Sequence, residues 1–107
     1  MATFYNASTR EVGDVDEVTV VTSTSDSTIV LSILVANVNG ASASDVTCSH
    51  RDSASALQNY VGFTVTVPAD SSLDLLSNKY ILPSGQSLGF LSSVSGALDV
   101  AVSYVEV

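Results

Sequence analysis

Alternation of apolar and polar residues is the dominant pattern along this chain. In the segment 60–67 every second residue is apolar, and Pro68-Ala69-Asp70 then ends the run. A period of two predicts a β-strand with one buried face. Similar runs, separated by turn residues, predict strands at about 18–24, 28–38, 45–51, 60–67, 71–76, 79–82, 87–92 and 98–106. Helical spacing is not sustained anywhere, so we predict an all-β, jelly-roll-like antiparallel β-sandwich of about eight strands.

The length of 107 residues leaves room for one domain. Residues 1–16 show little periodicity, and we interpret them as an N-terminal arm or an edge strand. Residues 17–107 then form a single β-sandwich domain. Because the arm has too few apolar residues to pack alone, we expect it to become ordered on contact with a larger particle.

Apolar residues occupy both faces of the predicted strand 28–38. Such a strand is either central and covered on both sides, or covered on its second face by another subunit. We expect the core face to consist of Ile29, Leu31, Ile33 and Val35. In the last strand the apolar positions change parity at Tyr104, which predicts a bulge there or a second face packed against a neighbour.

Two connections stand out between these strands. Asn39-Gly40 is typical of a type I′ turn, in which both residues have a positive φ. It predicts that the segment 45–51 pairs with 28–38 as a hairpin. The segment 52–59 is small and polar apart from Leu57, and it predicts the longest loop.

Charge restricts the possible partners. Three Lys and Arg against 11 Asp and Glu give a net charge of −8, and nucleic-acid binding depends on cationic contacts to phosphates. We therefore expect no nucleic-acid partner. The start of the chain lacks the basic and apolar regions of a signal peptide, and no apolar run is long enough to predict a membrane span. The single Cys48 is compatible with folding in a reducing cytosol.

Candidate chemistry is sparse. Ser49 and His50 are adjacent on a strand and so point to opposite faces, while Cys48 and His50 share a face without a second His or Cys nearby. The acidic run Asp14, Asp16 and Glu17 lacks the glycine spacing of a calcium loop, which favours a solvated loop. The sequence therefore predicts no catalytic, cofactor-binding or metal-binding residues and no enzymatic activity.

Several stretches are similar to small virion proteins of tailed phages, particularly those of marine and cyanobacterial hosts. They are Phe4 to Ser8, Val67 to Leu76, Ile81 to Leu88 and Leu98 to Val107. The resemblance covers most of the chain and implies a β-sandwich protein on the capsid or at the neck and tail. It carries no functional residue, and the stretch 41–59 has no counterpart in it.

The resemblance and the lack of catalytic motifs together predict a non-enzymatic virion protein, assembled in the host cytoplasm. We expect a capsid decoration or cement protein that packs between copies of the major capsid protein or other virion proteins. We also expect a homo-oligomer, with a trimer favoured over a dimer. The alternatives are a neck or tail ring component and a host-surface or carbohydrate-binding module. Absence of Trp weakens the last, although Tyr60, Tyr80 and Phe90 leave it open.

Overall fold

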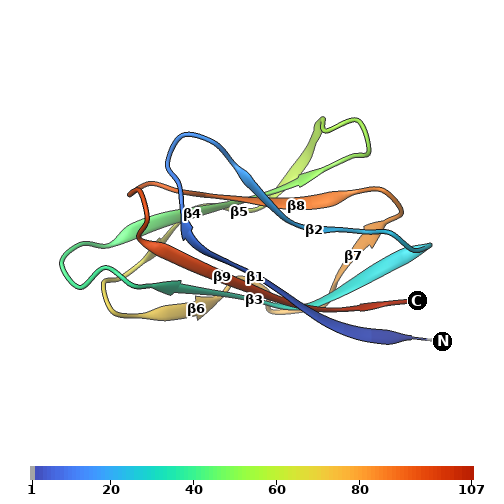
Figure 1. Ribbon diagram of the computed structural model, residues 1–107, viewed down its shortest axis with the longest axis horizontal. Coiled ribbons are helices and arrows are strands. Elements are labelled where there is room, and N and C mark those ends of the chain that lie inside the picture. Colours follow the sequence, from blue (N-terminus) through green and yellow to red (C-terminus); the bar gives the residue numbers. More distant parts are fainter. Residues whose placement is uncertain (1) are drawn as a thin grey trace.

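Two antiparallel sheets pack face to face in the computed structural model, which describes residues 2–107 (Figure 1). Residues 2–107 contain no helix, so the predicted all-β sandwich is confirmed. A five-stranded sheet comprises β1 (Thr3–Val12), β9 (Leu98–Glu106), β3 (Ser27–Asn37), β6 (Ser72–Asp74) and β7 (Tyr80–Pro83). A four-stranded sheet comprises β2 (Val18–Thr22), β8 (Ser87–Ser92), β4 (Ser44–Arg51) and β5 (Leu57–Val67).

The order of the strands is that of a jelly roll. β1 pairs with β9, β2 with β8, β3 with both β6 and β7, and β4 with β5. The chain is thus one long antiparallel ribbon that doubles back between β4 and β5. Rolling this ribbon adds the pairs β3–β9 and β4–β8, which completes the two sheets. β6 and β7 share one edge of β3, so residues 2–107 form nine strands instead of about eight.

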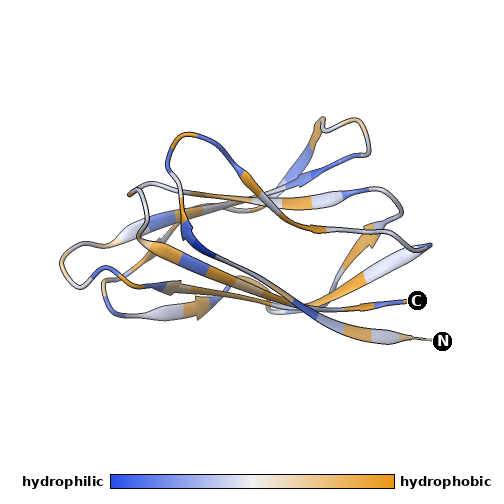
Figure 2. Cartoon of the chain, in the orientation of Figure 1, coloured by the Kyte–Doolittle hydropathy of each residue, from blue (hydrophilic) through white to orange (hydrophobic). Residues whose placement is uncertain are grey.

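The core lies between the sheets and is built from medium-sized aliphatic side chains. Phe90 is its largest fully buried member. Burying one such side chain contributes about 1.5–3 kcal/mol, so many small contributions hold the sandwich together. Figure 2 shows hydrophobic positions recurring along the strands of both layers. Fully buried aliphatic residues include Val30, Ile33, Val35, Val46, Val67, Leu82, Leu88, Leu98, Val100 and Val102.

A bulge in β3 changes which of its residues face the core. Ile33 and Val35 are fully buried, as predicted, but the prediction is wrong for Ile29 and Leu31, which are only partly buried. The register between β3 and β9 shifts between Val30 and Ser32, so Leu31 is an extra residue without a partner on β9. Beyond it Val30 takes the core position. The bulge expected near Tyr104 is therefore present, but it lies in β3, next to the residue that pairs with Tyr104.

The predicted hairpin at Asn39-Gly40 is wrong, because β3 and β4 lie in different sheets. Neither residue has a positive φ. The buried side chain of Asn37 donates to the carbonyl oxygens of Ser42 and Val67 at 3.0 and 2.9 Å. Asn39 Oδ1 accepts a hydrogen bond from the Ala41 N–H at 2.8 Å. These side-chain bonds shape the connection as a crossover between the sheets.

A tight turn joins β4 to β5, which shortens the loop predicted at 52–59. The carboxylate of Asp52 accepts hydrogen bonds from the N–H groups of Ala54 and Ala56, at 2.8 and 2.9 Å. The Asp52 N–H also donates to the Ala56 carbonyl oxygen. Asp52 thus makes most of the hydrogen bonds that close the turn, Arg51 Nη1 donates to the Ser55 carbonyl oxygen at 3.1 Å, and β5 begins at Leu57.

Residues 3–12 of the predicted arm or edge strand form β1, at one edge of the five-stranded sheet. Its register with β9 is continuous from Thr3 to Thr9, and Val12 lies in the core. The expectation that this segment becomes ordered only on a particle is wrong, because β9 already pairs with it.

Candidate interaction surface

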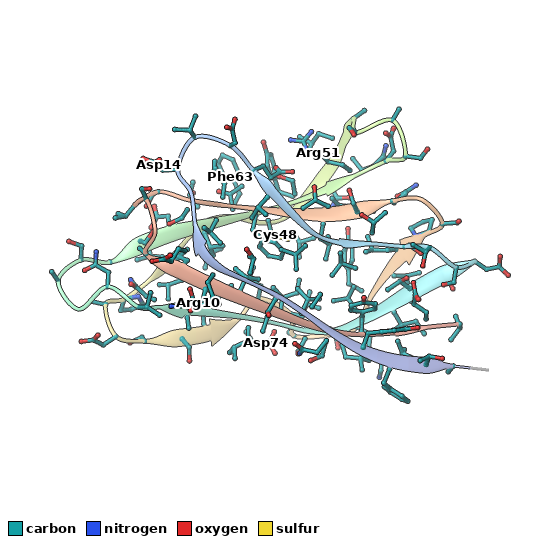
Figure 3. The ribbon with its side chains drawn as sticks, viewed as in Figure 1. Arg10, Asp14, Cys48, Arg51, Phe63 and Asp74 are labelled. Carbon is teal, nitrogen blue, oxygen red and sulfur yellow. The ribbon has the colours of Figure 1, made fainter. Side chains whose placement is uncertain are left out.

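β4 places its three chemically reactive residues in separate environments. Cys48 is fully buried between the two sheets (Figure 3), and burial, with a smaller effect of the Glu17 charge, raises the pKa of its thiol. Ser49 is buried beside the Glu17 carboxylate and helps to lower the pKa of that carboxylate. His50 hydrogen-bonds to Tyr80 instead. The structure therefore does not assemble a nucleophile and base from these neighbours.

His50 is the centre of a saturated hydrogen-bond network. Its Nε2 lies 2.6 Å from Gln86 Oε1, and an amide oxygen only accepts, so Nε2 carries the proton. Nδ1 then accepts from the Tyr80 hydroxyl at 2.7 Å, and that hydroxyl accepts from Asn59 Nδ2 at 3.0 Å. With both ring nitrogens engaged, His50 ties β4 to β5, to β7 and to the turn before β8.

Asp14 and Asp16 of the acidic run are exposed, whereas Glu17 is half-buried against Arg51 of β4. Its carboxylate binds Arg51 through two hydrogen bonds, Nε to Oε1 at 2.8 Å and Nη2 to Oε2 at 3.3 Å, and rests over Gly89. Burial raises the pKa of Glu17, but hydrogen bonds from Arg51 and Ser49 and the Arg51 charge outweigh it, so the pKa is lowered. Residues 2–107 contain no cluster of three or more His, Cys, Asp or Glu side chains suited to a metal ion.

The outer face of the five-stranded sheet carries a row of apolar residues in register. Cross-strand pairing aligns Phe4 on β1 with Val105 on β9, Ile29 on β3 and Ile81 on β7. We call these four residues the outer row. Phe4 and Ile81 are 74% and 53% exposed, whereas Val105 is buried between its neighbours although it is not part of the core. Figure 2 shows hydrophobic positions on β1 near the N-terminus and on β7.

A shallow groove lies further along the same face. Its volume is about 290 Å³, and it runs from β1 across β9 to β3. Small side chains of Ser8, Ala101 and Ala36 form its lining, Leu34 is its apolar wall, and Arg10 and Asp99 form an exposed ion pair at its end. The groove is therefore apolar near β3 and polar near β1.

A second exposed apolar patch lies on β5 of the other sheet. Tyr60 and Phe63 are 45% and 61% exposed, and their ring centroids are 4.7 Å apart. Leu57 is also exposed on this strand. Of the other aromatic residues named from the sequence, Phe90 is buried in the core and Tyr80 belongs to the His50 network.

No family model, curated protein or solved structure matches this chain. Within residues 2–107 there is also no helix of the length and hydropathy needed to cross a membrane. The exposed surfaces are therefore the features of this protein that bear on its function. The sequence contained one signal of the outer row, the two apolar faces of segment 28–38, but Phe4 and Ile81 join it only through strand pairing.

Proposed function

We propose that this protein is a non-enzymatic structural component of a tailed-phage virion, and that it decorates the capsid by docking on the major capsid protein. The observation that supports this most is the outer row. Four apolar residues from four strands line up on a face that no part of the described chain covers. Contiguous apolar patches on small proteins commonly mark interaction sites.

The fold is consistent with this role. Jelly rolls occur in viral capsid and lectin domains, and one fold serves many functions. The resemblance of the sequence to small phage virion proteins adds an independent argument from different residues. A cement protein acts by covering apolar surface on neighbouring shell subunits, and interfaces combine an apolar centre with a polar rim. The outer row, with the Arg10–Asp99 pair further along the face, has that composition.

The test is binding of the purified protein to expanded capsids that lack it. We expect Ile81→Ser to weaken binding at least about tenfold, because each 1.4 kcal/mol of lost contact energy is a factor of ten. Phe63→Ser is the matched control, since Phe63 is similarly exposed but on the other sheet. Equal binding of both variants and the parent, with all three folded, would contradict the proposal.

The Tyr60–Phe63 pair supports a second candidate function, a host-surface or carbohydrate-binding module. Sugar-binding sites present exposed aromatic faces, and these two rings lie together on β5. Glycan-array binding that is lost in Tyr60→Ala and retained in Ile81→Ser would favour this function. Electron microscopy of particles separates the structural roles, because a decoration protein covers the shell and a neck or tail protein forms one ring.

A further inference from the structure

The edge of β1 differs from the other edges of the two sheets. Proteins protect edge strands against pairing with other chains by keeping them short or by adding bulges, prolines or charges. β6 and β7 have three and four residues, and Pro83 ends β7. β2 has five residues and a register shift, and β5 has three register shifts. Each of these edges is therefore protected in one of the known ways.

β1 has none of these protections over most of its length. From Thr3 to Thr9 it pairs with β9 without a register shift, and this stretch contains no charged residue and no proline. Its other side has no partner in the described chain. A regular, uncharged edge of seven residues is a template for another strand.

The best partner for this edge is a second copy of the same edge. A net charge of −8 on each copy opposes association in general, but the uncharged stretch Thr3–Thr9 puts no like charges against each other. Two antiparallel β1 strands related by a two-fold axis form a closed, self-complementary contact. With the axis at Asn6, Phe4 of one copy lies opposite Ser8 of the second copy.

This register brings the exposed Phe4 to the groove. Ser8 lines the groove on β1, and Ala101 and Leu34 continue it across β9 and β3. Neighbouring strands are about 4.8 Å apart, so a Phe ring on the adjacent strand reaches the groove. Residues directly opposite each other in antiparallel strands lie on the same face of the sheet. Phe4 and Ser8 both lie on the outer face. The two-fold axis therefore places the Phe4 ring of each copy beside Ser8 of the other copy.

We infer that two copies pair through β1 around Asn6, so that Phe4 of each copy lies in the groove of the other. The two five-stranded sheets then form one continuous sheet. Ile29 and Ile81 of the outer row remain uncovered, so the pairing goes beyond the proposed docking on a capsid and does not depend on it. The contact closes after two copies, which gives a dimer where the sequence favoured a trimer.

Sedimentation equilibrium of the full chain measures the assembly. We expect a mass of about 22 kDa, twice the 11.0 kDa of one copy. Salt screens the repulsion between two copies of charge −8, so we expect the dimer Kd to fall as the salt concentration rises. Asn6→Lys puts two like charges at the axis and should raise the dimer Kd at least about tenfold. Gln58→Lys on the edge of β5 is the matched control and should leave it unchanged.

Cross-linking tests the register and does not require a destabilised interface. Residues directly opposite in an antiparallel pair have Cα atoms about 4.5–5.5 Å apart, which suits a disulfide. We expect Asn6→Cys to give a disulfide-linked dimer on oxidation, and Gln58→Cys to remain a monomer under denaturing, non-reducing conditions. A monomer at tens of micromolar, a trimer, or equal cross-linking of both variants would overturn the inference. Capsid binding by Ile81→Ser is a separate measurement, so either proposal can fail alone.

Discussion

Gly89 leaves room for the carboxylate of Glu17, since a Cβ atom at this position would overlap the carboxyl group. We expect Gly89→Ala to displace Glu17 and break its ion pair with Arg51. The free energy of unfolding should fall by only a modest amount, because the ion pair is partly exposed to solvent. Urea unfolding measures it. Gly13→Ala is the control, because a Cβ there meets nothing within 4 Å, and an equal effect of both changes would contradict the prediction.

The same ion pair makes stability depend on pH. The pKa of Glu17 is lower in the folded protein than its ordinary value of 4.5. The pair therefore stabilises the fold above pH 4.5, and this contribution is lost as the pH falls through the folded pKa. We expect the difference in unfolding free energy between the parent and Glu17→Gln to shrink as the pH falls from neutral to below 4.5. A difference that is the same throughout this range would refute it.

Cys48 should react with thiol reagents only after unfolding. Its side chain is fully buried, and burial raises the pKa of the thiol, so little of the reactive thiolate forms. The release of colour from a disulfide reagent, with and without denaturant, measures this. Reaction of the native protein at the rate of a small free thiol would show that the core opens around β4.

At the scale of single elements, the bulge in β3 gives Leu31 and Ile33 different burial, although the alternation in the sequence predicts both on the same face. Ile33 is fully buried, so Ile33→Ala should lower the free energy of unfolding by about 2–5 kcal/mol. Leu31 is only partly buried at the bulge, so Leu31→Ala should cost about 1 kcal/mol or less. Denaturant unfolding of both variants checks the difference, and equal losses would mean that the core extends to Leu31.

The strands themselves could be predicted because the period of two is a local property. Segments 87–92 and 98–106 begin and end in the structure where alternation and turn residues place them. The connection between β3 and β4 could not be predicted in this way, because Asn39-Gly40 has the same local chemistry in a hairpin and in a crossover. Contacts of Asn37 with the distant Val67 decide between them.

The sequence predicted less of the candidate interaction surface than of the strands. Phe4, Val105, Ile29 and Ile81 lie on four strands, and only the jelly-roll pairing aligns them. The partners of His50 are likewise remote, since Tyr80 and Gln86 are 30 and 36 residues away. Alternation predicts which residues share a face of one strand, but not which strands are neighbours.

For the whole molecule, the pairing of the chain's two ends should make folding slow. Thr3 pairs with Glu106, and β2 pairs with β8, so most of the chain must be closed into a loop before these contacts form. Proteins with such non-local pairing fold in about milliseconds to seconds. Stopped-flow refolding followed by tyrosine fluorescence measures the rate, since the chain has four Tyr and no Trp. Refolding in microseconds would contradict this expectation.

The turn between β4 and β5 has a practical consequence. It stands where the ribbon doubles back, away from β1 (Figure 1), and hydrogen bonds from Asp52 and Arg51 hold its backbone. Exposed turns of this kind tolerate added residues well. In the proposed decoration role, a foreign peptide inserted between Ala54 and Ser55 would lie away from β1, and the protein would serve as a carrier for displaying antigens on a particle.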